Sequence, residues 1–476
     1  MLNSKLIRVL ASLKPSELPR LQEFVESPYF NKKESLRLLC IYLCGIYPQF
    51  DALNVEKRKV FNNVFPMSKY NEKQLGYLQS DLIRLILQFF KVERIQAKEY
   101  STSMMSILSE RSLKSLYHKE VKQLKTNLSQ ITGKGTDHYW MSFKLYDKED
   151  RLFIAKNERK DDMSAHHASM NLDLFYVCRK LQYYTVLLNR RSILSKEITI
   201  PNMDFILEYA KNNFDDVPII NAYCEVIMMQ TKEVSLPHFY QLQEIIQKHN
   251  EAFSKKEIAE IYEEAINYCI QRISYDQVFY INEALKLYMV FLDSGNMYQN
   301  GFLSHWKFKN IIKLGLLLDR FEFVETFILS YIDKIESHHK VKALNYNFAE
   351  LYFAMENYDQ AQEYLSKVFF NDLELAYNLG SRMMLIKIYY HKDEMDALLS
   401  QIAAFTIFLK RSKNILNTKK KIYLNFCDIL NKILRQNPKH YTKIKLEIKN
   451  TKLLTATNWL LNVYHEKLPS ELIQKK

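Results

Sequence analysis

Apolar residues along most of the chain recur at intervals of three and four positions, the spacing of one face of an α-helix. The pattern is clearest between Lys342 and Asp372, where one helical stripe ends near Tyr352 and a second begins at Tyr358. The short polar segment before Tyr358 separates the two stripes, so this stretch predicts a two-helix hairpin. Two helices cannot bury both stripes by themselves, and the hairpin therefore needs neighbouring helices.

The hairpin belongs to a repeat with a period of 37 residues. Phe321, Tyr358 and Met395 mark equivalent positions, and an acidic residue follows each of them. Ten residues before and seven residues after each anchor the chain is again apolar, at Ile311, Phe348, Leu385, Ile328, Leu365 and Ile402. The spacing predicts three stacked helical hairpins in residues 301–410.

The middle unit resembles a tetratricopeptide repeat (TPR), with Ala349, Tyr352, Tyr358 and Ala361 at positions of that family's pattern. The flanking units carry larger apolar residues in place of the two alanines, and 37 residues exceeds the family period of roughly 34. Segments 27–31 and 388–411 are also similar to bacterial helical-repeat proteins, a likeness that implies no known activity. The expected fold is all-α, an elongated α-α superhelix (a TPR-like solenoid) with an N-terminal helical bundle.

The N-terminal part has helical spacing without the repeat. Residues 72–96 are its most apolar segment, with apolar side chains on several faces, and are predicted to form the centre of the bundle. We expect four parts: the bundle at 1–132, an irregular helical region at 137–300, the repeats at 301–410 and a basic helical cap at 411–476.

Composition agrees with a folded helical protein. Only 8 of the 476 residues are Gly and 10 are Pro, which leaves little material for the glycine-rich loops of an α/β enzyme. Charge interrupts the apolar residues at the N-terminus, and no run of about 18 apolar residues occurs, so we expect neither a secretory signal nor membrane insertion. Six scattered cysteines without a CxxC pair favour buried thiols in a reducing, cytoplasmic environment.

Motifs that would indicate catalysis were sought and not found. The sequence contains no HExxH, GxSxG or GxGxxG, so we predict no enzyme activity, cofactor or small-molecule substrate. Two histidine doublets, His166-His167 and His338-His339, could suggest a metal site. Adjacent residues on a helix point about 100° apart, so we predict that both doublets are surface side chains and that no metal is bound.

The resemblance also implies where a partner would bind, because the first helix of each hairpin lines the inner surface of a TPR array. Lys313, Asn347 and Lys387 resemble the residues with which some TPR proteins hold a peptide carboxylate. The 37-residue register transfers the inner positions to Lys309, Asn310, Lys313, Tyr346, Asn347, Glu350, Met383, Lys387 and Tyr390. The first hypothesis is a non-catalytic protein-interaction scaffold with this peptide groove; the alternative for this face is a solvated surface without a dedicated ligand.

Positive charge is concentrated near the C-terminus. Of the formal net charge of +13, an excess of eleven lies in residues 410–452. This segment contains thirteen Lys or Arg residues and two acidic residues, Asp428 and Glu447. The candidate polyanion patch consists of Lys410, Arg411, Lys413, Lys419, Lys420, Lys421, Lys432, Arg435, Lys439, Lys443, Lys445 and Lys449. Lysine predominates, which suits phosphate contact and not base recognition. The second hypothesis is a non-specific RNA-, DNA- or ribosome-associated protein; the alternative is a solubilising lysine face.

Overall fold

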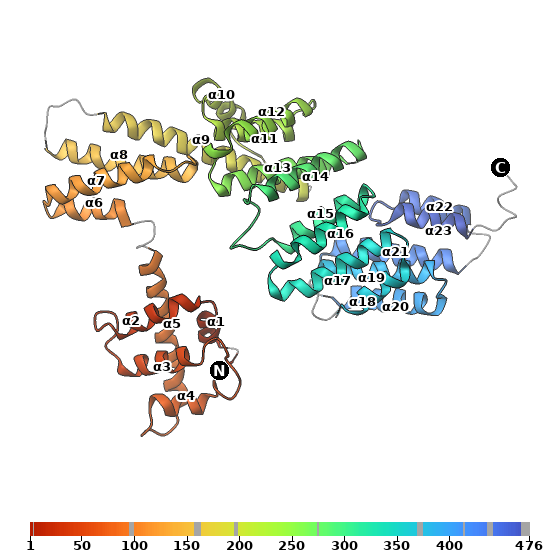
Figure 1. Cartoon of the computed structure of the whole chain (residues 1–476), viewed down its shortest axis with the longest axis horizontal. Helices are drawn as coiled ribbons and strands as arrows, with labels where there is room; N and C mark the ends of the chain where they lie inside the picture. The colour runs from red at the N-terminus through yellow and green to blue at the C-terminus, as the bar shows by residue number, and fades with distance from the viewer. Residues whose placement is uncertain are drawn as a thin grey trace. The chain divides into compact units, whose positions relative to one another are not determined.

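The computed structural model describes residues 1–2, 4–94, 100–156, 163–194, 199–273, 276–368, 375–412, 415–435 and 441–467. Within these ranges the chain is helical, and its only β-structure is a bridge between Gln299 and Phe302 (Figure 1). The all-α class expected from the sequence is therefore confirmed. Contacts divide the chain into two compact units, Met1–Tyr176 and Val177–Lys476.

The first unit begins with a bundle built around one long helix. Helix α5 contacts each of the four helices that precede it, as the apolar character of residues 72–96 predicted. Its side chains Leu82 and Ile86 are fully buried, together with Leu6, Leu39 and Phe61 from the surrounding helices. The bundle helices are α1 (Lys5–Ala11), α2 (Leu18–Glu26), α3 (Glu34–Gly45), α4 (Lys57–Val64) and α5 (Glu72–Arg94).

The rest of the first unit has its own apolar cluster, which includes Met105, Tyr117 and Leu145. Helix α9 is shared between the units, since the boundary lies after Tyr176. The helices of this part are α6 (Tyr100–Glu110), α7 (Lys114–Ser129), α8 (Thr136–Lys156) and α9 (Ser164–Leu194).

The second unit continues from α9 as a succession of contacting helices. Polar side chains cap the N-termini of several of these helices. The Ser254 hydroxyl accepts a hydrogen bond from the Glu257 amide, and the Asp276 side chain accepts one from the Phe279 amide. The helices before the repeats are α10 (Met203–Asn213), α11 (Pro218–Thr231), α12 (Leu236–His249), α13 (Lys255–Arg272) and α14 (Gln277–Asp293).

Three helix pairs follow, and they obey the 37-residue register. The second helix of each pair begins at Phe321, Tyr358 or Met395, and each of these three side chains is half-buried. The six apolar positions before and after the anchors are all buried. The pairs are α15 (His305–Leu317) with α16 (Phe321–Tyr331), α17 (Ser337–Ala354) with α18 (Tyr358–Ser366), and α19 (Leu375–His391) with α20 (Met395–Arg411).

The turn inside each pair has the same backbone geometry. Asp319, Glu356 and Asp393 are spaced by 37 residues and adopt positive φ angles of 52°, 59° and 55°. The following amide in each turn bonds a carbonyl five residues earlier, as Asn357 N does to Tyr352 O at 2.8 Å. This left-handed residue closes the first helix of each pair and reverses the chain without glycine.

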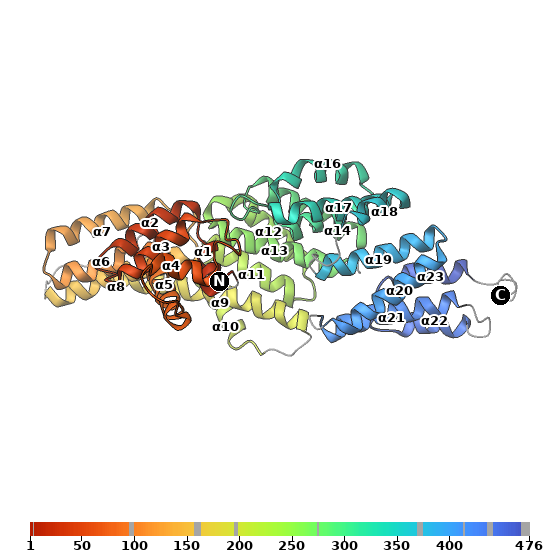
Figure 2. The same ribbon diagram turned by 90° about the horizontal axis from the view of Figure 1, so that it is seen from below.

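The last helices pack onto the third pair. Helix α20 contacts α21 and lies beside it in Figure 2, and α21 in turn contacts α22 and α23. Leu398 and Phe405 of α20 share one buried cluster with Phe426, Leu430 and Leu460. These C-terminal helices are α21 (Asn417–Leu434), α22 (Tyr441–Asn450) and α23 (Thr457–Glu466).

Candidate functional site

A groove of about 630 Å³ opens among the first helices of the three pairs and the C-terminal helices. Helices α15, α17 and α19 each contribute one stripe of side chains, and α21 and the loop before α23 close the end. The lining consists of Lys309, Lys313, Leu316, Leu317, Tyr346, Glu350, Phe353, Ala354, Ala376, Gly380, Met383, Met384, Lys387, Lys419, Tyr423, Thr455 and Ala456.

The register explains why these residues meet. Each helix presents positions four residues apart, which lie on one helical face. Because the helix pairs repeat every 37 residues, equivalent positions of α15, α17 and α19 face the same space. Six of the nine candidate groove residues line it, in two equivalent sets: Lys309, Tyr346 and Met383, and Lys313, Glu350 and Lys387.

The other three candidates lie elsewhere. Asn310 donates its side-chain amide to the Tyr288 hydroxyl at 3.3 Å. Asn347 is fully buried, and its amide donates to the Ala343 carbonyl at 2.7 Å. Tyr390 is buried and bonds Glu466 at 2.7 Å. Asn310 and Asn347 each follow a lining residue directly, and a step of one residue turns a helical side chain about 100° away from the groove.

The part of the lining that comes from the C-terminal helices was not predicted from the sequence. Lys419 and Tyr423 are one turn apart on α21 and complete the groove, although Lys419 was assigned to the polyanion patch. Phe353 and Gly380 could have been found by extending each helical stripe by one more turn. Nothing in the repeat pattern predicts the packing of α21, because it follows the last unit.

Two aromatic rings lie beside Lys309, one of the lysines of the groove. The Lys309 ammonium lies 4.1 Å from the Tyr346 ring centroid and 4.7 Å from the Tyr377 centroid. Burial lowers the pKa of Lys309, and the Glu350 carboxylate opposes this shift. The flat electron-rich faces of the two rings stabilise the cation where water is partly excluded.

A second lysine is held in a similar way on α19. The Lys387 ammonium lies 5.4 Å from the Trp459 ring centroid and 6.0 Å from that of Phe353. Burial lowers the pKa of Lys387, and the positive charge of Lys313 lowers it further. For both lysines, burial is the main cause of the lowered pKa.

One acid lies among these lysines. Tyr346 donates its hydroxyl to Glu350 Oε1 at 2.6 Å, and burial raises the pKa of this tyrosine. Glu350 Oε2 is buried and has no hydrogen-bond partner among the described residues. The lining thus carries four lysines against a single carboxylate, together with methionine, leucine and aromatic surface. Such a lining suits an anionic ligand with apolar parts.

The described residues of the candidate polyanion patch are spread over several helices. Lys410 and Arg411 end α20, Lys419 faces the groove, and Lys432 is paired with both Asp428 and Glu447 at 2.7 Å. Lys413 and Lys439 lie outside the described residues. The exposed members of the patch are Lys410, Arg411, Lys419, Lys421, Lys432, Arg435, Lys443 and Lys449, whereas Lys420 and Lys445 are half-buried.

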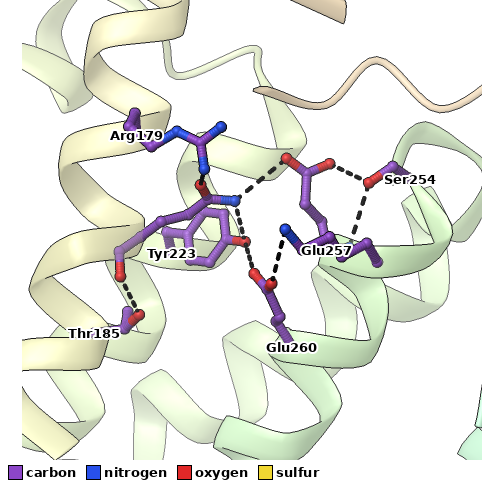
Figure 3. Close-up of polar contacts among 8 residues, drawn as sticks. Arg179, Thr185, Tyr223, Ser254, Glu257 and Glu260 are labelled. Carbon is purple, nitrogen blue, oxygen red and sulfur yellow. Dashed lines mark hydrogen bonds and ion pairs between the residues drawn. The ribbon is translucent and has the colours of Figure 1, made fainter. Parts of the chain in front are cut away.

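A separate polar network joins α9, α11 and α13 (Figure 3). Gln182 donates to the Tyr223 hydroxyl at 2.9 Å and to Glu257 at 3.4 Å, and Tyr223 donates to Glu260 at 3.2 Å. The buried Glu257 also accepts from Ser254 at 2.5 Å. Burial raises the pKa of both Tyr223 and Glu260.

One turn further along α13, Glu264 forms a second polar cluster between the same helices. Its two oxygens accept hydrogen bonds from Asn189 and from Gln230, the latter at 2.9 Å. Burial raises the pKa of Glu264 to about 6. The acids of this network already accept bonds from amide and hydroxyl groups, so we interpret the network as a polar layer between packed helices and not as a ligand site.

Comparisons with known proteins add no assignment to these features. No protein-family model, curated protein or solved structure matches the chain. A search of the described helices for one long and apolar enough to span a bilayer found none.

Proposed function

We propose that the chain is a non-catalytic, protein-binding repeat protein in which α15–α20 form a TPR-like superhelix. The support is the repetition of three features at intervals of 37 residues: helix starts, buried positions and left-handed turns. A repeat of this kind places equivalent side chains along one continuous surface, which is how helical-repeat proteins bind extended partners.

The groove between α15, α17, α19 and α21 binds an acidic peptide segment in this proposal. The observation that carries it is the imbalance of four lysines and one carboxylate around a partly apolar groove. Lys309 and Lys387 are half-buried beside aromatic rings, and burial lowers their pKa values. A ligand carboxylate would supply the missing counter-charge in a site where charge pairing is only partly screened by water.

The apolar lining favours a peptide over a bare anion. Met383 and Met384 are buried beside the lysines and form part of the groove wall. Methionine side chains are flexible and adapt to different apolar side chains. An extended segment with alternating acidic and apolar residues would place its acids near the lysines and its apolar side chains against this wall.

The test is fluorescence anisotropy with a labelled peptide of alternating acidic and apolar residues. Lys313→Glu combined with Lys387→Glu reverses two groove charges and should weaken binding at least about tenfold. Lys211→Glu with Lys232→Glu is the control, since both lysines are exposed in the same unit and neither lines the groove. An amidated form of the peptide separates a terminal carboxylate from acidic side chains. Equal losses in the two double variants would contradict a groove site.

Non-specific nucleic-acid binding is the second candidate function. It is favoured by the exposed lysines on α21 and α22, of which Lys421, Lys443 and Lys449 do not line the groove. Reversal of these three to Glu should weaken binding to any long nucleic acid and flatten its salt dependence, because fewer counterions are released. It should leave peptide binding unchanged. Wild-type protein without salt-sensitive nucleic-acid binding would eliminate this candidate.

A further inference from the structure

The segment that leads into α17 brings three potential metal ligands together. Glu336 is the residue before the helix, and His338 and His339 lie in its first turn. One ligand atom from each of the three residues lies within 4.8 Å of the other two. The His338 Nδ1 atom is 3.5 Å from Glu336 Oε2.

The first turn of a helix explains why the two adjacent histidines converge. Inside a helix the preceding turn restricts the side-chain rotamers, and successive side chains point about 100° apart. No turn of α17 itself precedes His338 and His339, so both rings can lean over the start of this helix. Their ring centroids are 3.9 Å apart. His338 is exposed and His339 is half-buried, whereas the prediction that the two neighbouring imidazoles diverge is wrong.

A second helix holds the cluster from the other side. The ring of His305, the first residue of α15, packs on His339 with centroids 3.9 Å apart. A cavity of about 220 Å³ lies between the two helix starts, and Ser304, His305, Glu336 and His339 are among its lining residues. Space for an ion and its water molecules therefore adjoins the potential ligands.

The electrostatics of the segment depend on Glu336. Helix N-termini carry partial positive charge, which opposes a cation. The Glu336 carboxylate supplies a compensating negative charge at the start of α17. Lys340, which follows His339 directly, is paired with Asp333.

We propose that Glu336, His338 and His339 bind a divalent transition-metal ion such as Zn²⁺, with the remaining position open to water. Two imidazoles and one carboxylate form a ligand set that such ions accept. Ligand atoms of a tetrahedral zinc site are about 3.4 Å apart, as follows from metal–ligand distances of about 2.1 Å. The three ligand atoms lie within 4.8 Å of one another, so each pair would have to approach by at most about 1.4 Å to reach that spacing. None of the three residues lines the peptide groove, so this inference stands apart from the proposed function.

Metal binding would fix the start of α17 and stabilise the fold. An ion that binds the folded chain alone raises the unfolding temperature by mass action. His305 acts as a positioning residue here, because its ring limits the rotation of His339. The bound ion would thereby also stabilise the packing of α17 against α15.

The experiment is calorimetric titration of untagged, chelator-treated full-length protein with Zn²⁺, supported by the visible absorption of Co²⁺ added in its place. We expect saturable binding and a higher melting temperature for the wild type. Glu336→Gln should weaken binding at least about tenfold, and His338→Ala with His339→Ala should abolish it. His166→Ala with His167→Ala is the matched control, since that doublet is not part of a three-ligand group among the described residues.

The outcomes separate clearly. Binding that is lost in the His338/His339 variant and kept in the His166/His167 variant supports the site. Absence of saturable Zn²⁺ binding by the wild type overturns it, as does an equal loss in both doublet variants. If the double alanine variant loses helicity by circular dichroism, the Zn²⁺ affinity of Glu336→Gln is the deciding measurement. This variant replaces an exposed side chain with one of equal size. Unchanged affinity in Glu336→Gln overturns the proposal.

Discussion

The contact between Gly380 and Tyr346 gives a direct test of how the groove is packed. A Cβ atom added to Gly380 would lie 2.3 Å from the Tyr346 hydroxyl oxygen and 3.1 Å from the ring carbon that carries it. Tyr346 is buried, bonds Glu350 at 2.6 Å and meets the Tyr377 ring edge-on at 4.8 Å. Gly380→Ala therefore forces Tyr346 to move and to lose its hydrogen bond.

The expected magnitude follows from three contributions. Alanine is favoured over glycine in a helix interior by about 1 kcal/mol. Overpacking costs about 1–3 kcal/mol, and loss of a hydrogen bond to a charged group costs about 1.5–3 kcal/mol. We therefore expect Gly380→Ala to lower the free energy of unfolding by about 1.5–5 kcal/mol. The unfavourable contributions exceed the gain in helix propensity.

A double-mutant cycle with Tyr346→Phe isolates the contact. This replacement removes the oxygen that lies closest to the added methyl group and also removes the hydrogen bond. In its presence we expect Gly380→Ala to cost about 1 kcal/mol or less, which corresponds to a coupling of about 2 kcal/mol. Effects that add within about 0.5 kcal/mol would refute the placement of the Tyr346 hydroxyl against Gly380.

The assay is guanidinium unfolding followed by tryptophan fluorescence. Trp140 lies in the first unit, whereas Trp306 and Trp459 lie in the second with the groove. In a Trp140→Phe background the signal reports the second unit alone. Circular dichroism on that background reports the helices of both units, so its coincidence with the fluorescence tests whether the whole chain unfolds in one two-state transition.

Three further predictions use the same assay. Ala361→Trp should cost about 1–3 kcal/mol or more, because Ala361 is fully buried, whereas the exposed neighbour Gln360→Trp should have little effect. The free energy of unfolding of the Glu264→Gln variant, relative to that of the wild type, should rise by about 2 kcal/mol between pH 4.5 and pH 7.5. The folded-state pKa of Glu264 is about 6, above its ordinary value of 4.5. The stabilisation of the wild type by Glu264 is therefore present below pH 4.5 and is lost as the pH rises through 6. A stability difference between variant and wild type that does not vary with pH would contradict this. Glu356→Gly should raise the unfolding free energy by about 0.5–1 kcal/mol by relieving the left-handed conformation, and a decrease would mean that the turn is not strained.

The sequence by itself determined the helices and their repeat. Alternation of apolar positions at helical spacing predicted the hairpins, and the starts of α16, α18 and α20 fall on the predicted anchors. These features depend on local spacing, which a single chain displays directly. The left-handed turn residues Asp319, Glu356 and Asp393 were not predicted, because acidic residues do not mark a positive φ angle as glycine does.

Only the tertiary structure decided which of the candidate residues share a site. Lys309 and Tyr346 are 37 residues apart and meet because two helix pairs pack in register, whereas Asn347 turns into the core one position later. The arrival of Lys419 from α21 and the convergence of His338 with Glu336 depend on helix packing and on side-chain rotation at a helix end. Repeat spacing specifies which positions are equivalent, but the neighbours of a side chain are set by contacts between segments distant in sequence, and these have no local signature.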